Sequence, residues 1–356
     1  MAHIKIHLSK IKYNAIVLKK ILDDRGIQMM PVLKCAGGDI QIAQLFENIG
    51  FDLVAESRLN LIESDSTHLD YMMIKGATPT EVPKVVNNAT ISLQTDLNVI
   101  RAINEEAKKQ RKSHSILLMI DWKDGREGIL TYEAIDYLNE IIHLDSIYLK
   151  GIAFNFMCFR PLPPTEEDIS YIERFILNIK KATGLNFPTI SGGNSSMLSL
   201  AMYHDLGAIN ELRIGEALFR GYETAYQQRL PFLYEDTIEI VGQILEIKPR
   251  LNVSTRQAYM QALVDIGQLD TEISELIPKD EKLNIVGSTS DLLLLDLGGA
   301  YSYQVGDSVS FKMGYGAIAQ SMYSKQMKKL YYQDKGIETL IENFSSATEN
   351  KVLNQY

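Results

Sequence analysis

The stretch Met29-Met30-Pro31-Val32-Leu33-Lys34-Cys35-Ala36-Gly37-Gly38 predicts a short apolar strand that ends at a lysine and is broken by two glycines. Burial at a strand end disfavours the charged form of a lysine, and the neutral amine is the nucleophile that forms a Schiff base with an aldehyde. A structural interpretation is also open, in which the stem of Lys34 packs while its ammonium reaches solvent.

Short apolar runs recur after this stretch, and segments with helical spacing separate them. A short apolar run between turn residues predicts a buried strand, and alternation with helices is typical of a parallel sheet. The runs are Met30–Lys34, Asp52–Ala55, Tyr71–Lys75, Thr90–Leu93, Ile116–Asp121, Tyr148–Phe154, Thr189–Ser191 and Glu211–Arg213. The helical segments include Ile40–Ile49, Leu97–Arg111, Tyr132–His143, Glu166–Ala182 and Met197–Leu206. Eight strands alternating with helices predict an α/β fold, the (β/α)8 TIM barrel.

The pattern changes in the last third of the chain. Residues 232–332 contain short alternating runs split by Gly, Asp and Pro, which predict an all-β C-terminal domain. Residues 3–8 alternate in the same way, and we expect them to join that domain as a strand. The predicted boundaries are therefore 9–231 for the barrel and 232–332 for the β domain, followed by a polar tail over 333–356.

Composition excludes several classes of protein. The chain has 356 residues, of which 46% are hydrophobic, so it can build a large core. Its net charge of −9, without a basic block, argues against a nucleic-acid surface or a polybasic membrane patch. Cys35 and Cys158 are the two cysteines, a number that fits a reducing compartment without a disulfide framework. No apolar run could span a bilayer, and the first residues alternate unlike a signal peptide, so we expect a cytoplasmic protein.

Polar side chains stand at the carboxyl ends of the predicted strands. These ends carry Lys34, Asp121, Asn155, Ser191 and Arg213. In a TIM barrel the carboxyl ends of the strands meet on one face, which holds the active site. Each residue alone could serve a local structural purpose, such as capping a helix or satisfying a loop. Together they predict a site for an anionic ligand.

A Gly/Ser loop strengthens that interpretation. Ser191-Gly192-Gly193-Asn194-Ser195-Ser196 follows a predicted strand and opens a helical segment. Backbone N–H groups and hydroxyls in such a position can cradle a phosphate, although Gly/Ser loops are common for other reasons. Leu212-Arg213-Ile214-Gly215-Glu216-Ala217-Leu218 follows, and its glycine allows the backbone to approach a second side of the phosphate.

The chain resembles the alanine racemase family, whose members are fold-type III pyridoxal-phosphate enzymes, in the order of barrel and β domain and in several motifs. The motifs are Lys34 at a strand end, Asp121-Trp122-Lys123-Asp124-Gly125-Arg126-Glu127-Gly128, Ser191–Ser196 and Leu212–Glu216. The loop, the Arg-Glu-Gly motif and the Asn-x-x-Cys of Asn155–Cys158 are most similar to the ornithine racemase branch. The resemblance covers the chain to about Tyr332.

The resemblance implies a role for each matching residue, with pyridoxal 5'-phosphate as the cofactor. Lys34 is similar to the Schiff-base lysine, Arg213 to the arginine that faces the pyridine nitrogen, and Arg126 to an arginine near the substrate carboxylate. The other implied cofactor-binding residues, beside the ring or the phosphate, are Asn155, Ser191, Asn194, Ser195, Ser196, Gly215, Glu216 and Tyr315.

The β domain also resembles the family and implies a homodimer with shared active sites. Gly287–Asp291 is similar to the loop that reaches into the partner's site, and Val305–Asp307 and Tyr315–Ile318 are similar to the family's final strands. Asp291, like Asp124 and Glu127, is an acid that could meet the side-chain ammonium of a basic amino acid. The alternative is that these acids are exposed loop charges.

The second group needed to move a proton is less well defined. Alanine racemases have a phosphate-binding tyrosine four residues after the lysine, where this chain has Gly38. Their second catalytic base is a tyrosine early in the β domain, and Tyr259, the only tyrosine near that stretch, has the wrong spacing. Cys158 is another candidate for the second base, because a thiolate can move a proton. A buried, inert cysteine is the alternative.

The resemblance thus implies an isomerase, a pyridoxal-phosphate-dependent racemase of a basic amino acid such as ornithine or lysine. The alternatives are an alanine racemase, a fold-type III decarboxylase or aldolase, a non-catalytic carrier of the cofactor, and a barrel enzyme that acts on sugar phosphates. Related decarboxylases carry a Glu-Pro-Gly-Arg motif that this chain lacks, and the carriers resemble the barrel alone.

Overall fold

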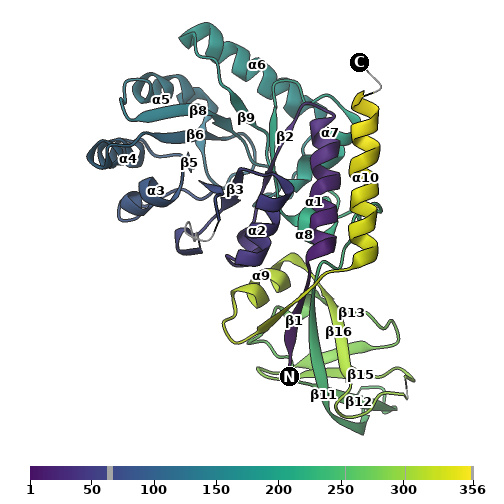
Figure 1. Cartoon of the computed structure of the whole chain (residues 1–356). Helices are drawn as coiled ribbons and strands as arrows, with labels where there is room; N and C mark the ends of the chain where they lie inside the picture. The colour runs from purple at the N-terminus through teal and green to yellow at the C-terminus, as the bar shows by residue number, and fades with distance from the viewer. Residues whose placement is uncertain (62–66, 253, 301, 354–356) are drawn as a thin grey trace. The chain divides into compact units, whose positions relative to one another are not determined.

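The computed structural model describes residues 1–61, 67–252, 254–300 and 302–353 (Figure 1). The chain divides into two compact units. The barrel unit consists of Asn14–Lys34 and Ile40–Leu233, and the sheet unit consists of Met1–Tyr13, Cys35–Asp39 and Tyr234–Tyr356. Among the described residues, no helix combines the length and apolarity needed to cross a membrane.

The barrel unit contains the predicted ring of parallel strands. The strands are β2 (Gln28–Pro31), β3 (Leu53–Glu56), β4 (Asp70–Met73), β5 (Ile91–Gln94), β6 (His114–Asp121), β8 (Ile147–Ala153), β9 (Thr189–Ser191) and β10 (Glu211–Ile214). They pair in the order β2-β10-β9-β8-β6-β5-β4-β3, and the short strand β7 (Ile129–Leu130) adds to β6. The predicted (β/α)8 fold is confirmed, including its short last strand.

The ring closes between β2 and β3 at a single parallel bridge. Val32 bridges Ala55, and the N–H of Leu33 donates to the carbonyl of Ala55 over 2.9 Å. On the other side, the N–H of Val32 donates to the carbonyl of Ile214 over 2.8 Å. The strand therefore ends at Pro31, earlier than predicted, but its pairing continues to Leu33.

Helices follow most of the strands (Figure 1). Their bounds are α1 (Leu8–Asp23), α2 (Ile40–Ile49), α3 (Val82–Asn88), α4 (Leu97–Gln110), α5 (Ala134–Ile141), α6 (Glu166–Thr183), α7 (Leu198–Tyr203) and α8 (Glu216–Arg220), with 3-10 turns η1 (Lys34–Ala36), η2 (Leu59–Leu61), η3 (Thr131–Glu133) and η4 (Ser195–Met197). The longest of these, α6, begins with a capping box between Thr165 and Asp168 and ends at Gly184 in a left-handed conformation. Local sequence therefore sets both of its ends.

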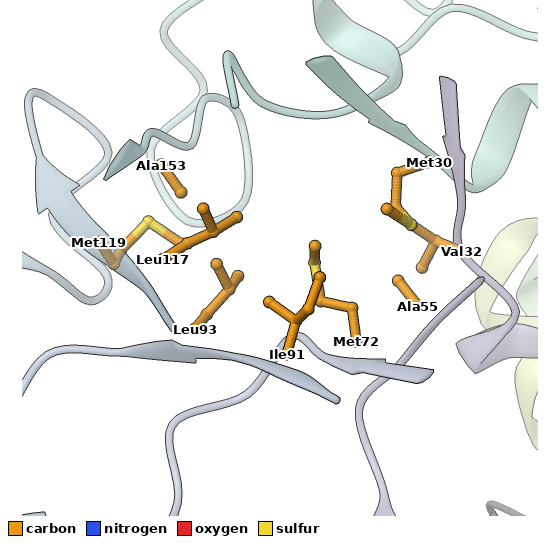
Figure 2. Close-up of a cluster of buried hydrophobic side chains, with 9 residues drawn as sticks. All are labelled: Met30, Val32, Ala55, Met72, Ile91, Leu93, Leu117, Met119 and Ala153. Atoms are coloured by element: carbon orange, nitrogen blue, oxygen red, sulfur yellow. The ribbon is translucent and has the colours of Figure 1, made fainter. Parts of the chain in front are cut away.

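Apolar side chains fill the interior of the ring (Figure 2). The cluster consists of Met30, Val32, Ala55, Met72, Ile91, Leu93, Leu117, Met119 and Ala153. Several of its members are two positions apart on one strand, because alternate side chains of a strand share a face. The barrel is therefore a packed core, and its chemistry is confined to the strand ends.

The sheet unit is mainly antiparallel. Its strands pair in the order β13-β16-β11-β12-β15-β14, with β1 between β11 and β17. The bounds are β1 (His3–His7), β11 (Ile238–Leu251), β12 (Ala258–Val264), β13 (Leu276–Pro278), β14 (Asn284–Ser288), β15 (Leu293–Asp296), β16 (Ser308–Met313) and β17 (Lys328–Tyr332), with the turn η5 (Ile273–Glu275). The N-terminal strand pairs with β11, so Ile4 and Ile6 lie opposite Ile240 and Ile238.

The sheet unit is not all β, and the expected final strands are wrong. Val305 and Gly306 form a turn, and the segment that begins at Tyr315 is a helix, α9 (Tyr315–Tyr323). Its buried residues, which include Ala317 and Ser321, lie on one helical face, and the N–H of Ala317 donates to Glu275 Oε2 over 3.0 Å. Helical spacing and this carboxylate at the first turn favour the helix over a strand.

The polar tail and the first helix meet within the sheet unit. The tail forms the helix α10 (Lys335–Leu353), and residues 354–356 lie outside the described part of the chain. Ser9 does not cap α1, which begins at Leu8. The hydroxyl of Ser9 instead accepts a hydrogen bond from the N–H of Asp334 over 2.9 Å.

Candidate active site

The candidate residues of the barrel unit come mainly from four neighbouring strands. The strand order places β8, β9, β10 and β2 side by side. Asn155 follows β8, Ser191 ends β9, Arg213 lies on β10, and Lys34 follows β2. Because parallel strands end on one face of a barrel, this half of the ring gathers two cations and two neutral polar groups.

The guanidinium of Arg213 is the fixed centre of this arrangement. Arg213 is buried, with 4% of its surface exposed. Its Nη2 donates to the carbonyl oxygen of Phe154 over 2.6 Å and to Oδ1 of Asn155 over 2.7 Å, and its Nη1 donates to the hydroxyl of Ser191. Burial lowers the pKa of Arg213, while the nearby carboxyl of Glu211 raises it. The guanidinium remains a cation whose position three acceptors determine.

Strand register shows that Arg213 faces the interior of the barrel. Arg213 lies level with Met30, and Ser191 lies level with Ala153. Met30 and Ala153 both belong to the interior cluster. Since paired residues of neighbouring parallel strands share a face, Arg213 and Ser191 also point inward, at the layer where the apolar core ends.

The Gly/Ser loop turns sharply after β9. Gly193 has a φ of 125°, a conformation that side-chain-bearing residues rarely adopt. Asn194 then caps the turn η4, because its Oδ1 accepts from the N–H of Ser196 over 2.9 Å. Its Nδ2 donates to the carbonyl of Phe156 over 2.8 Å, which ties this loop to the loop after β8.

Two buried hydroxyls form the candidate phosphate cradle. The Oγ of Ser195 accepts from the N–H of Ala217 over 3.3 Å, so the loop after β9 meets the start of α8. The Oγ of Ser196 is buried and has no hydrogen-bond partner among the described residues. A buried hydroxyl without a partner costs free energy unless a ligand satisfies it. Gly215 precedes α8 and Glu216 is its first residue, so both lie beside Ala217, which contacts this loop.

Lys34 lies in a turn rather than on a strand. It is half-buried and opens η1 directly after the bridge that closes the ring. Glu56, at the end of β3, is 2% exposed, and its Oε1 accepts from the N–H groups of Ser57 and Arg58 over 2.6 and 3.3 Å. Burial raises the pKa of Glu56, while these hydrogen bonds and the charge of Lys34 lower it.

The loop after β8 carries the candidate cysteine. Cys158 is exposed, and its Sγ accepts a hydrogen bond from Nδ2 of Asn194 over 3.2 Å. Met157 has a φ of 59°, which makes the loop turn just before the cysteine. Asp124 Oδ1 accepts from the N–H groups of Cys158 and Phe159, each over 3.0 Å, so a buried carboxylate from the loop after β6 holds this segment. The alternative of a buried Cys158 is therefore wrong.

The loop after β6 separates into a fixed and an exposed part. Lys123 Nζ donates to Asp168 Oδ2 over 2.6 Å, and Trp122 donates to Oδ1 of the same residue over 2.8 Å. Trp122 also stacks on Tyr171 with ring centroids 3.5 Å apart. Arg126 is exposed and pairs with the adjacent Glu127. Arg126 is therefore available to a ligand, whereas Lys123 is part of the scaffold.

The remaining two candidates belong to the sheet unit. Tyr315 is the first residue of α9 and is half-buried. Asp291 is exposed in the turn between β14 and β15, where its N–H donates to Thr289 Oγ1 over 3.4 Å. Their roles at a cofactor or substrate stay predictions.

Sequence reasoning missed two groups that act on Arg213, one as a hydrogen-bond acceptor and one through its charge. One is the carbonyl of Phe154, and no side-chain signal could have revealed a backbone acceptor. The other is Glu211, which is 1% exposed and shares a hydrogen bond with Ser191. Alternation along β10 places Glu211 on the same face as Arg213, so the Glu-x-Arg spacing could have revealed it.

Comparison with known proteins supplies independent information. The family model described as "Alanine racemase, N-terminal domain" matches residues 6–223. Ornithine racemase of Acetoanaerobium sticklandii is 32% identical over 346 residues, which cover 92% of this chain and 98% of the relative. Lysine racemase of Thermotoga maritima is 25% identical over 346 residues, with 92% and 97% covered.

A solved structure supports the fold independently. It is the alanine racemase of Bartonella henselae with covalently bound pyridoxal phosphate. The TM-score is 0.72, with 93% of this chain and 99% of that chain covered. The sequences are only 16% identical, so the likeness shows the shared fold and no more.

Proposed function

Because the chain belongs to the alanine racemase family and is an amino-acid racemase, we propose that it interconverts the L and D forms of a basic amino acid with pyridoxal 5'-phosphate as cofactor. The curated relatives named ornithine racemase and lysine racemase match it over 92% of its length. Their names support ornithine or lysine as the substrate. The observation that carries the proposal is the buried guanidinium of Arg213 beside the end of the strand that leads to Lys34.

The residues present fit the cofactor. Ser196 offers a buried hydroxyl without a partner among the described residues, and Ser195 lies beside it with a hydroxyl already directed at α8. Together with the N–H groups of Gly215 and Glu216, they would hold the phosphate. Arg213 would hold the ring nitrogen. When bound, pyridoxal phosphate supplies the electron withdrawal that makes the α-hydrogen of an amino acid acidic.

The chain's own groups would then move the proton. The ε-amine of Lys34 would hold the cofactor at its aldehyde carbon, and as a free amine it would remove or return a proton at Cα on one side. Cys158 is our candidate for the other side, because its exposed Sγ lies at the end of the neighbouring loop and accepts a hydrogen bond from Asn194. Removal by one group and return by the other inverts the centre.

Arg213 would restrict the reaction to this outcome. A guanidinium presents only donors and does not lose its proton in a protein, so a nitrogen in front of it stays unprotonated. An unprotonated ring nitrogen withdraws electron density less strongly than a protonated one. The charge of Arg213 therefore supports reversible proton transfer over decarboxylation or transamination.

We also propose that the protein acts as a homodimer with shared active sites. The resemblance implies a phosphate-binding role for Tyr315 and, for the loop that carries Asp291, a role in the partner's site. Arg126, exposed after β6, would bind the substrate carboxylate. Sedimentation of the purified protein tests this part, since a fully active monomer at micromolar concentration would contradict it.

Chiral chromatography tests the function directly. The protein is incubated with pyridoxal phosphate and, separately, with L-ornithine, L-lysine and L-alanine, and the two enantiomers of each are quantified. We expect the D form to accumulate fastest from ornithine or lysine, without release of CO₂ or an aldehyde. Fastest turnover of alanine would identify an alanine racemase instead, and release of CO₂ would identify a decarboxylase.

A further inference from the structure

Glu211 is a buried acid in the interior of the barrel. It lies level with Gln28 on β2 and with Ser191 on β9, two residues before Arg213 on β10. Because Arg213 and Ser191 face inward, Glu211 faces inward too. Glu211 is closed to solvent, because only 1% of its surface is exposed.

The hydrogen bonds of Glu211 are incomplete for a carboxylate. Its Oε1 has no partner among the described residues, and its carboxyl shares a hydrogen bond with Ser191. Arg213 donates to the carbonyl of Phe154, to Asn155 and to Ser191, and within the described part of the chain it makes no ion pair with Glu211. An ionised carboxylate with a bare oxygen in an apolar interior is costly, whereas a protonated carboxyl carries no charge to desolvate.

Few charged groups act on Glu211. They are Arg213 on the same strand and Lys150 on β8, and the residues level with Glu211 on the paired strands are uncharged. Burial raises the pKa of Glu211, whereas the hydrogen bond from Ser191 and the charges of Arg213 and Lys150 lower it; the balance is a raised pKa.

We propose that Glu211 is a protonated, neutral carboxylic acid in the folded protein and that Ser191 couples it to Arg213. Glu211 then adds no negative charge to the interior below the site and does not offset the positive charge of Arg213. Glu211 is thus a positioning residue. This last consequence rests on the proposed function, since it concerns the charge presented to the ring nitrogen of the cofactor.

Infrared difference spectroscopy of the holoenzyme tests the protonation state. The C=O stretch of a protonated carboxyl lies apart from the carboxylate bands. At about pH 8, where an ordinary glutamate is ionised, we expect wild type minus Glu211→Gln to show this band. The absence of such a band would overturn the proposal, whatever the enzyme's substrate.

Glu223 provides a matched control in the same unit. It is also 1% exposed, but its carboxylate accepts from the N–H groups of Ala225, Tyr226 and Gln228 over 3.0, 3.0 and 2.9 Å. These donors suit an ionised group, so wild type minus Glu223→Gln should lack the protonated-carboxyl band. A band lost equally in both variants would show that the signal does not report on Glu211, and would overturn the assignment.

Stability against pH gives a second, cofactor-independent readout. A group that holds its proton in the fold but ionises from 4.5 upward when unfolded destabilises the protein as pH rises. Urea unfolding of the cofactor-free protein gives an unfolding equilibrium constant for wild type and for Glu211→Gln. The ratio of the wild-type constant to the variant constant should rise by up to about tenfold for each pH unit above 4.5. A ratio that stays constant would contradict the proposal.

A second variant covers the case in which Glu211→Gln does not fold. Glu211→Met removes the carboxyl without adding a donor, and apolar replacement of a buried polar group is often tolerated. We expect this variant to fold and to lack the protonated-carboxyl band. The ratio of the wild-type unfolding constant to that of Glu211→Met should rise with pH in the same way. A Met variant that fails to fold, while isotope-labelled wild type shows no protonated glutamate band at about pH 8, would overturn the proposal.

Discussion

Lys34 and Arg213 are two cations at neighbouring strand ends, and the structure holds them in opposite ways. Lys34 is half-buried and begins a turn, just past the last hydrogen bond that fixes its strand. Arg213 is 4% exposed and has three acceptors in fixed positions. If Lys34 both bonds to a ligand and carries a proton, its side chain needs more than one conformation. If Arg213 sets the charge beside the cofactor ring, its side chain needs only one.

Each cation also has its own buried acid. Glu56 lies near Lys34, and its Oε1 accepts hydrogen bonds from backbone N–H groups. Glu211 lies near Arg213, and its Oε1 has no hydrogen-bond partner in the described structure. We therefore expect Lys34 to contribute to turnover and Arg213 to contribute to both turnover and stability. Mutations should therefore separate them.

Lys34→Ala should have the largest effect. We expect racemisation to fall by about 10³-fold or more, because one proton-transfer group and the covalent anchor are lost together. The wild-type protein should show a visible absorbance band from the cofactor bound to Lys34, which borohydride reduction abolishes. Lys34→Ala should lack this band. Chiral chromatography and a visible spectrum measure both outcomes, and circular dichroism should show an unchanged fold. A variant that remains yellow and active would refute the role of Lys34.

Arg213→Ala should lower both turnover and stability. It leaves the carbonyl of Phe154 and the side chains of Asn155 and Ser191 without their donor, which we expect to cost about 3 kcal/mol of unfolding free energy. Turnover should fall by about 10²-fold. Urea unfolding and steady-state kinetics measure the two effects. Equal destabilisation by Lys34→Ala would break the comparison between the two cations.

Cys158→Ala tests the second proton-transfer group. We expect about a 10²-fold loss of turnover. One enantiomer of the substrate should still exchange its α-hydrogen for solvent deuterium, because Lys34 would still act on its side, whereas the other enantiomer should not. Asn194→Ala, which removes the hydrogen bond to Sγ, is a useful companion and should have a smaller effect. Full racemisation by Cys158→Ala would exclude the thiol.

The pH dependence of stability should distinguish Glu56 from an ordinary surface acid. Burial raises its pKa above 4.5, so its contribution to stability is greatest below that pH and is lost as pH rises toward the folded value. Glu56→Gln should remove this loss, by up to about tenfold in the unfolding constant per pH unit. Lys34→Ala should extend the loss to higher pH, because the lysine charge lowers the pKa of Glu56.

Asp291→Ala should have the smallest effect. If Asp291 meets the side-chain ammonium of the substrate, KM for ornithine and lysine should rise several-fold, while KM for alanine should not change. Exposed charge pairs contribute little, which limits the expected effect. Equal changes for all three substrates would assign Asp291 to the loop alone.

The barrel could be predicted because its signal is repeated and local. Short apolar runs and helical segments alternate, and even the three-residue strand β9 and the four-residue strand β10 stand where the sequence places them. The gathering of Asn155, Ser191 and Arg213 followed from their positions at strand ends. Their detailed bonding could not be predicted, since it depends on a carbonyl oxygen and on the register between strands.

The sheet unit was harder to predict. Its strands are separated along the chain, and their order depends on long-range pairing, as for β1 with β11 and β17. The resemblance implied a strand at Tyr315–Ile318, but the carboxylate of Glu275 supplies a hydrogen-bond partner at the start of a helix. That partner lies 42 residues earlier, so no local pattern could reveal it.

The closure of the ring has a dynamic consequence for the reactive lysine. A full ladder joins β5 to β6, but the joint between β2 and β3 depends on the Val32–Ala55 bridge and the amide of Leu33. Such a joint should open first in native-state hydrogen exchange, so the Leu33 amide should exchange sooner than the interior amides of β6. The lysine that we propose as the reactive amine therefore follows directly after a joint that one bridge and one amide hold.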